Sequence, residues 1–483
     1  MLFPTILCKG GGMNYKSKKN PAEFWKPIIN DFNPVGPIDP DDVRNFFVDR
    51  KATQPTKSVV QRLAISLQNS IGQRSPYKGL LTGHVGSGKT SELMRLGQYL
   101  ATDFFVVWFD GENTLSRDKA NQFDILLGMG IAVYLAAKSV GMQPNKKLTD
   151  AFVKSFASFV RKYEDRKTFT LKLDQLAKQV FTIAITAGAG VLGGPAGAVM
   201  AGAAAAGVGA FKATALELNV KDELVRYLEL PANRQEIVGN LNKIIFDVQK
   251  LAKKPLLVIT DGLDKVSALR ARLLFAESSL LAEAACALIY AAPIEFYHRV
   301  YGSYAAAVFS EYSLLPNPPV NKRPPTGDGW GRKRDFDSSE GNVIREIISQ
   351  RLEFRGHTTN EVITPEAQNL IASASGGIVR DAIRFMQYAA LSAQIEKVLQ
   401  INPSLVRSVI ETQRQEMRAR LTATHQDALI AVLRRGSLVG GASEVVEDEL
   451  LHAAYLLSYQ GSDGDFWFDA HPNALFSLSA QSA

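Results

Sequence analysis

The stretch GLLTGHVGSGKTSELMRLGQYL, residues 79–100, decides the fold of this chain. The short apolar run over 79–82 is typical of a buried strand, and the amphipathic run over 87–100 predicts a helix. Three glycines at positions 83, 86 and 88 separate the two runs and allow the backbone to turn tightly. The sequence therefore predicts a strand, a glycine-rich turn and a helix in direct succession.

Residues 83–90, GHVGSGKT, match the P-loop pattern G-x-x-x-x-G-K-[ST] without a mismatch. In such a turn the backbone N–H groups and the start of the helix point at a phosphate, and a lysine reaches the β- and γ-phosphates. We expect Lys89 in that role and Thr90 as a ligand of Mg²⁺. The predicted nucleotide-binding residues of this segment are Gly83, Gly86, Ser87, Gly88, Lys89, Thr90 and Ser91.

A second apolar strand, LLVIT over residues 256–260, ends at the acid Asp261. Open α/β sheets bind ligands at the carboxyl ends of their strands, so Asp261 is predicted to share the metal with Thr90. Asp264 follows three positions later. It is a candidate for orienting the attacking water or supporting the metal indirectly; the alternative is an exposed acid in the turn.

Further apolar runs at 104–110 and 287–291, with a weaker one at 308–315, resemble strands buried on both faces of a parallel sheet. The fold class predicted is α/β. Between 104–110 and 256–260 lie about 145 residues, far more than one crossover needs, so a large helical insertion is implied at about 113–230.

Composition along the chain predicts five parts. They are an extended lead-in at 1–40, a P-loop ATPase core at 41–316, a basic Pro/Gly loop at 317–342, a small helical lid at 343–405, and a winged-helix-like domain at 406–483. The last part rests on helices followed by two strands around a Gly/Asp turn at 459–465. Residues 411–483 carry five arginines against ten acids, which favours protein contacts over DNA contacts for this part.

The P-loop, the segment Asp261-Gly262-Leu263-Asp264 and the segment Ser375-Gly376-Gly377-Ile378-Val379-Arg380-Asp381 together resemble the AAA+ and STAND superfamily, near its origin-recognition branch. The resemblance spans about residues 33–390. It implies ATP with Mg²⁺ as the ligand and Arg380 as the lid arginine, sensor 2, that touches the γ-phosphate. It also implies that residues 46–50, with Val48 and Arg50, pack on the adenine.

The chain departs from the family pattern in two places. The tip of the strand 287–291 reads YAAP, with no polar sensor 1 residue, and Asp261 is followed by glycine where an acid is expected. The missing sensor 1 residue indicates hydrolysis that is either slow or assisted by a residue in trans. The missing acid after Asp261 fits a nucleotide-governed switch better than a fast motor. The resemblance also implies an arginine finger, for which Arg299 is the nearest candidate and Arg332 and Arg334 are others.

Overall composition adds limits. A formal net charge of +7 over 483 residues is a mild bias that does not by itself establish nucleic-acid binding. Two cysteines cannot build a disulfide framework, which indicates a reducing, cytoplasmic location. The loop at 317–342 carries Lys322-Arg323 and Arg332-Lys333-Arg334 with Trp330 between them. A nucleic-acid contact through these residues is an alternative to an ordinary solvated loop. Residues 179–211, uncharged and rich in Gly and Ala, allow a membrane-inserting element, but two short packed helices are favoured because the bulky residues are few.

These patterns lead to one main hypothesis and one alternative. The main hypothesis is a switch ATPase whose nucleotide state controls homo-oligomerisation or engagement of a protein effector or sensor. The resemblance implies a bacterial defence system as its setting. The alternative is a DNA-associated AAA+ ATPase, such as a loader or a regulator of transposition or replication.

Overall fold

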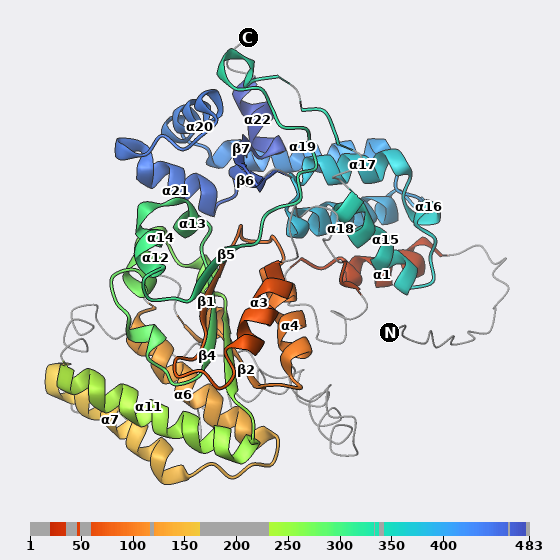
Figure 1. Cartoon of the computed structure of the whole chain (residues 1–483). Coiled ribbons are helices and arrows are strands. Elements are labelled where there is room, and N and C mark those ends of the chain that lie inside the picture. The colour runs from red at the N-terminus through yellow and green to blue at the C-terminus, as the bar shows by residue number, and fades with distance from the viewer. Residues whose placement is uncertain are drawn as a thin grey trace.

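The computed structural model describes residues 20–34, 46–48, 59–115, 120–164, 231–332, 334–337, 342–461 and 464–479. Figure 1 shows three groups of elements within them: a central sheet with its helices, a helical group beside it, and a C-terminal group above the sheet. The predicted Gly/Ala element at 179–211 and the predicted adenine contact Arg50 lie outside the described residues.

The central sheet has five strands in the order β2-β3-β4-β1-β5, and every neighbouring pair is parallel. This confirms the predicted α/β class with a parallel sheet. Strand β4 lies between β3 and β1, although it follows both in the sequence. Strand β1, which leads into the P-loop, pairs with β4 on one side and with β5 on the other. The strands are β1 (Lys78–Thr82), β2 (Phe105–Asp110), β3 (Leu256–Asp261), β4 (Ala287–Ala292) and β5 (Glu311–Leu314).

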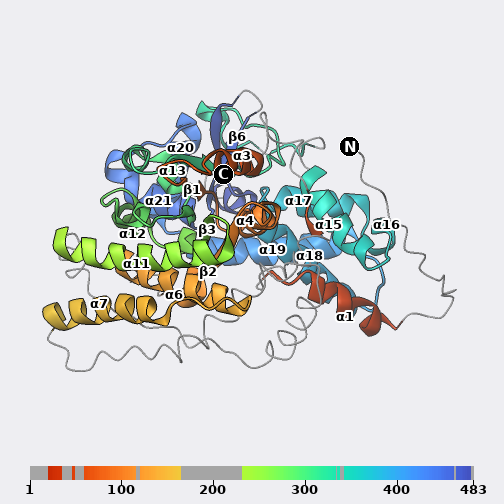
Figure 2. The same ribbon diagram turned by 60° about the horizontal axis from the view of Figure 1, so that its bottom comes forward.

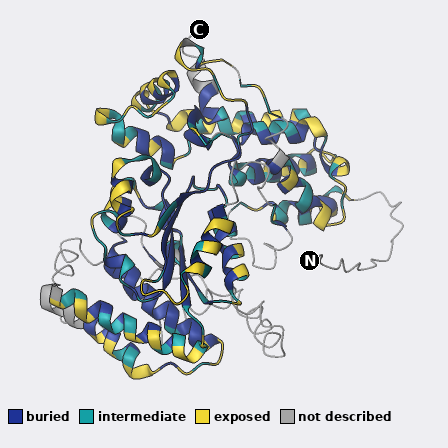
Figure 3. Ribbon diagram, viewed as in Figure 1, coloured by how far each residue is buried: buried dark blue, intermediate teal, exposed yellow. Residues whose placement is uncertain are grey.

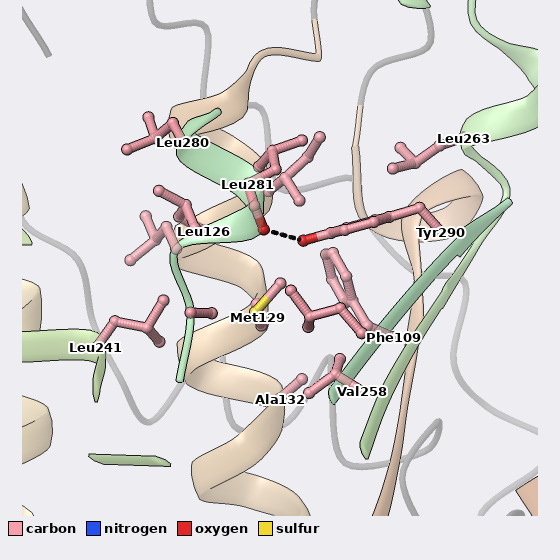
Figure 4. Packing of buried hydrophobic residues seen from close by; sticks show 14 of the residues in the cluster. Phe109, Leu126, Met129, Ala132, Leu241, Val258, Leu263, Leu280, Leu281 and Tyr290 are labelled. Atoms are coloured by element: carbon pink, nitrogen blue, oxygen red, sulfur yellow. Dashed lines mark hydrogen bonds between the residues drawn. The ribbon is translucent and has the colours of Figure 1, made fainter. Parts of the chain in front are cut away.

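Alternation along the strands sends side chains to two separate hydrophobic cores. Trp108 and Ile259 join the core on one face, whereas Phe109, Val258 and Tyr290 join the core on the other. Most positions of the five strands are buried (Figure 3), whereas the ends of β2 and the first half of β5 are half-buried. Figure 4 shows the core that contains Phe109 from close by, where the Tyr290 hydroxyl donates to the Leu281 carbonyl at 2.9 Å. Burial on both faces explains why the strands read as continuous apolar runs.

Helices cover both faces of the sheet. The helices α3 (Val59–Asn69) and α4 (Lys89–Leu100) pack on the Trp108 face. On the opposite face, α6 (Gln122–Ser139) lies between β2 and the helices α7 (Lys146–Glu164) and α11 (Pro231–Ala252), which run side by side in Figure 2. This arrangement buries α6 on nearly every side. No described helix is both long enough and apolar enough to cross a bilayer.

The helical group beside the sheet consists of α15 to α19. It also contains α1 (Pro21–Asp31), so the prediction of extended chain through residue 40 is wrong for this segment. Asn20 caps α1, Trp25 and Ile28 are buried against the group, and the Trp25 indole donates to the Val398 carbonyl at 2.7 Å. The other helices are α15 (Asn342–Phe354), α16 (Thr359–Val362), α17 (Pro365–Ala374), α18 (Val379–Ile395) and α19 (Pro403–Arg420).

The C-terminal module, residues 423–479, contains two helices, a hairpin and a third helix, and its helices and strands up to the hairpin follow the predicted order of elements. Before the module, α19 ends at Arg420, and the Thr422 side chain caps the helix that follows. The elements are α20 (Ala423–Arg435), α21 (Glu444–His452), the antiparallel strands β6 (Leu456–Gln460) and β7 (Phe466–Ala470), and α22 (Pro472–Ser479).

The basic loop is not a free linker. Trp330 is 7% exposed and packs into the core of the C-terminal module, and Arg334 makes two hydrogen bonds, at 2.7 and 2.8 Å, to the Asp469 carboxylate. Burial therefore removes the Trp330 ring and the Arg334 guanidinium from the surface that a nucleic acid would contact. Lys322, Arg323 and Arg332 remain exposed.

The remaining elements are short and lie mostly near the carboxyl ends of the strands or in the connections that follow them. They are α5 (Gly111–Thr114), η2 (Leu263–Lys265), α12 (Ala268–Phe275), η3 (Leu280–Ala282), α13 (Glu295–His298), α14 (Val300–Ala305), η4 (Gly327–Gly329) and η5 (Gly441–Ser443).

Candidate nucleotide site

The P-loop joins β1 to α4, as predicted. Gly86 and Gly88 have φ values of +88° and +96°, a region that residues with a Cβ seldom adopt. Gly88 is the N-cap of α4 and has no side chain with which to cap it. The N–H groups of the first turn, which includes Ser91, are thus not claimed by a capping side chain and suit an anion.

Lys89 is 3% exposed and held by three oxygens. Its ammonium nitrogen lies 2.7 Å from the Asp264 carboxylate and donates to the carbonyls of Gly83 and His84 at 2.7 and 2.9 Å. The alternative that Asp264 is an exposed acid is wrong, because Asp264 is 6% exposed and paired with Lys89. The two residues that the sequence separates by most of the core are therefore in direct contact.

Thr90 and Asp261 also meet. The Thr90 hydroxyl donates to the Asp261 carboxylate at 2.7 Å. Burial and, to a smaller extent, the nearby charge of Asp264 together raise the pKa of Asp261 to about 6. A hydroxyl and a carboxylate at this distance are the hard oxygen ligands that Mg²⁺ takes beside phosphate oxygens. The pair fits the predicted metal role.

The lid reaches the P-loop at Arg380, near the start of α18. The Arg380 backbone N–H donates to the Gly86 carbonyl at 3.1 Å. A Cβ built on Gly86 would lie 2.9 Å from the Cβ of Arg380, so glycine is what allows this close approach. The Arg380 backbone thus contacts the P-loop, while its role at the γ-phosphate stays a prediction.

Three charged residues near the site were missed by sequence reasoning. Asp110 ends β2 directly opposite Asp261 in the sheet register. Glu112, just after it, forms an ion pair with Lys265, and its backbone lies against Gly262. Burial lowers the pKa of Lys265 to about 8, and the charges of Arg380 and Lys89 lower it too. The signal for Asp110 was present, because FFVVWFD ends in an acid just as LLVITD does.

Arg299 is not placed as an arginine finger. It is buried in the seam between α13 and α21, where its guanidinium bonds the Asp448 carboxylate at 2.6 Å and the Glu447 carboxylate at 3.1 Å. A finger has to present its guanidinium to the phosphate of a neighbouring protomer, and this one is committed within its own chain. In the described arrangement Arg299 therefore does not fit the predicted role of an arginine finger, because acids of the C-terminal module bind its guanidinium.

Residues 46–48 lie between the core and the helical group. The Phe47 ring stacks under the Arg95 guanidinium of α4 at 4.1 Å, and Phe46 packs edge-on against Phe354 of α15. Val48 packs against the core of the helical group. The segment thus contacts the two bodies that flank the P-loop, while its contact with adenine stays a prediction. The tip of β4 carries Ala291 and Ala292, both fully buried.

No family model and no curated protein matches the chain. Solved structures do. The ORC1 protein of Aeropyrum pernix in complex with DNA is 14% identical, with 92% of this chain and 94% of that one covered and a TM-score of 0.38. Cdc6p of Pyrobaculum aerophilum is 12% identical, with 90% of this chain and 96% of that one covered and a TM-score of 0.35. Drosophila ORC bound to DNA is 12% identical, with 99% of this chain and 96% of that one covered and a TM-score of 0.35.

Likeness at this level transfers neither an activity nor a partner, so the function proposed below depends on the residues of this chain. Its own strands and P-loop define a parallel α/β core with a helical group and a C-terminal hairpin module.

Proposed function

We propose that the chain is an ATP-binding P-loop ATPase in which the nucleotide state sets the arrangement of core, lid and C-terminal module. The observation that carries this proposal is the convergence of Lys89, Thr90, Asp261 and Arg380 on one turn. Lys89 and Arg380 supply positive charge for the phosphates, and Thr90 with Asp261 supplies oxygen ligands for Mg²⁺.

Bound ATP would take the Lys89 ammonium from Asp264 to its own β- and γ-phosphates. The freed Asp264 carboxylate then lies beside the phosphates, where it can orient a water for attack. Asp110 and Glu112 are further carboxylates at the same strand ends. Because sensor 1 and the acid after Asp261 are absent, we expect slow turnover and a role that depends on which nucleotide is held.

The switch requires that ATP and ADP favour different arrangements. Homo-oligomerisation and an effector or sensor partner are the proposed outputs of the switch, and the defence setting stays a prediction from the sequence resemblance. Mass photometry of the wild type and Lys89→Ala, each without nucleotide, with ADP and with ATP plus Mg²⁺, tests the output. Assembly by ATP in the wild type alone supports the switch, and monomers in all six samples contradict nucleotide-driven assembly.

A DNA-associated ATPase is the second candidate. The favouring observation is the exposed set Lys322, Arg323 and Arg332 on one loop; DNA is also present in two of the similar structures, the archaeal ORC1 and the Drosophila ORC. Duplex binding measured over a salt series decides the matter, because phosphate contacts give a steep loss of affinity with salt. If no binding occurs at low salt, this candidate is removed.

A further inference from the structure

The His84 side chain of the P-loop packs into the C-terminal module. Its ring is 1% exposed. Nδ1 lies 3.1 Å from the Leu451 carbonyl oxygen at the end of α21, and Nε2 accepts a hydrogen bond from the Ser458 backbone N–H of β6 at 2.9 Å. Both ring nitrogens are therefore used by backbone groups of a segment more than 360 residues away in sequence.

These two partners fix the protonation of the ring. A backbone N–H can only donate, so Nε2 carries no proton, and a carbonyl can only accept, so Nδ1 carries one. The ring is thus neutral and in the Nδ1–H tautomer. Burial and, to a smaller extent, the charge of Lys89 lower the pKa of His84 to about 3, which agrees with a neutral ring at physiological pH.

The C-terminal module that contacts His84 also contacts the helical group and the core. The Tyr459 hydroxyl donates to the Gly376 carbonyl at 2.8 Å, in the segment that leads to Arg380. His452 bonds the Glu295 carboxylate at 3.0 Å, next to the buried pair between Arg299 and Asp448. The module therefore contacts the P-loop, the lid and the helix after β4, which are the three parts that surround the nucleotide site.

We propose that His84 is a positioning residue that couples the P-loop to the C-terminal module, so that phosphate binding loosens or shifts the module. The link is the backbone of His84 itself, whose carbonyl accepts from Lys89 while its ring holds Leu451 and Ser458. A bound phosphate draws the Lys89 ammonium away from the Gly83 and His84 carbonyls. The His84 peptide unit then loses the hydrogen bond from Lys89, and the same residue carries the ring that contacts Leu451 and Ser458. This inference rests on the proposed nucleotide site.

Hydrogen exchange of the peptide 454–461, which contains the Ser458 amide, reports the contact directly. In the wild type, ATP plus Mg²⁺ should speed exchange of this peptide by roughly tenfold, the effect of losing one buried hydrogen bond. His84→Ala should exchange at the faster rate without nucleotide and show no further response to ATP. His84→Asn keeps a donor near the Nδ1 position and His84→Gln an acceptor near Nε2, so each should fall between the two.

His425→Ala is the matched control, because His425 bonds Glu449 of the same module but does not touch the P-loop. It should respond to ATP as the wild type does. A spectroscopic check uses ¹⁵N-histidine labelling: the wild type should show a signal of the neutral Nδ1–H tautomer that persists from about pH 8 to pH 5, and His84→Gln should remove that signal.

Two outcomes would overturn the coupling. One is an unchanged exchange rate of 454–461 in wild-type protein that demonstrably binds ATP; the other is a His84 ring that titrates near its ordinary pKa. Binding of a fluorescent ATP analogue is measured on the same samples. If the wild type binds no nucleotide, the proposed function fails; if it binds and 454–461 does not respond, only the coupling fails.

Discussion

Two buried ion pairs lie within the same region of the molecule and differ in what holds them there. Lys89 and Asp264 pair inside the core, with side-chain exposures of 2% and 7%, whereas Arg299 and Asp448 pair across the seam to the C-terminal module, at 7% and 11%. The first pair follows from a motif and a strand end, both readable in the sequence. The second exists only because the module docks on α13, and no local pattern encodes that docking.

The contrast teaches that burial alone does not assign a charged residue to chemistry. Under the proposed function, a bound phosphate replaces Asp264 as the partner of the Lys89 ammonium. Arg299 is freed only if the module moves. The first pair thus responds to a small molecule, and the second to a change in the arrangement of domains.

The largest expected effect comes from Lys89→Ala. The variant loses the cation that faces the phosphates, so ATP affinity should fall by roughly a hundredfold or more. Asp264 is left buried without its partner, and the free energy of unfolding should fall by about 3 kcal/mol. Isothermal titration with ATP and chemical denaturation measure the two effects.

Lys254→Ala is the control, because Lys254 donates to the Ala101 carbonyl far from the P-loop. Its ATP affinity should equal that of the wild type. Unchanged ATP affinity in Lys89→Ala would show that Gly83 to Thr90 does not act as a P-loop here.

The second-largest effect is expected from Arg299→Ala, which removes the ion pair between Arg299 and Asp448. It leaves Asp448 and Glu447 buried without their cation, so docking of the C-terminal module should weaken by about 2–3 kcal/mol. Limited proteolysis between α20 and β6 should therefore become faster while ATP affinity changes little. Arg355→Ala, which removes an ion pair to Asp31 on α1, is the control. An Arg299→Ala variant with a tightly docked module and reduced ATPase activity would restore the arginine-finger interpretation.

Arg380→Ala tests the link between lid and phosphate. If Arg380 touches the γ-phosphate, its loss should reduce the preference for ATP over ADP by roughly tenfold, since a hydrogen bond to a charged group is worth about 1.5 kcal/mol or more. Arg384→Ala, one turn later on α18 and paired with Asp381, should keep the preference. Equal losses of ATP and ADP affinity in Arg380→Ala would place the arginine elsewhere than at the γ-phosphate.

Much of the core was predictable because its signals are local. The five strands, the turn at 83–90 and the acid Asp261 each depend on neighbours within a few residues, and the structure has the strands where the apolar runs predicted them. Asp110 was within reach as well, since it ends a strand as Asp261 does.

The contacts between domains were not predictable. Helix α1 forms because Trp25 and Ile28 bury against helices more than 300 residues away, and the cationic loop lost Trp330 and Arg334 to the C-terminal module. His84 looked like an unconstrained position of the P-loop pattern. Its role depends on Leu451 and Ser458, which no periodicity places beside it.

The smallest effect expected is a pH dependence of module docking that separates wild type from His84→Gln. The docked ring keeps a pKa of about 3, lowered by burial, while a released ring regains its ordinary value of 6.5. The released state therefore binds more protons below about pH 6.5, so docking is complete above that value and weakens as the pH falls. Between about pH 7.5 and 5.5 this linkage amounts to about 1 kcal/mol.

Other groups at the same seam also titrate, and their signs differ. Burial lowers the pKa of His298 to about 4, which acts in the same direction as His84, whereas burial raises the pKa of Asp448 to about 6, which acts in the opposite direction. A pH profile of the wild type therefore contains the contributions of His298 and Asp448 as well as that of His84. In His84→Gln these groups are unchanged, so the difference between the two pH profiles belongs to the His84 ring. Proteolytic release of the module, measured at each pH, should become faster as the pH falls, with a shallower slope in the variant than in the wild type. Parallel profiles would mean that His84 is not neutral and docked as described.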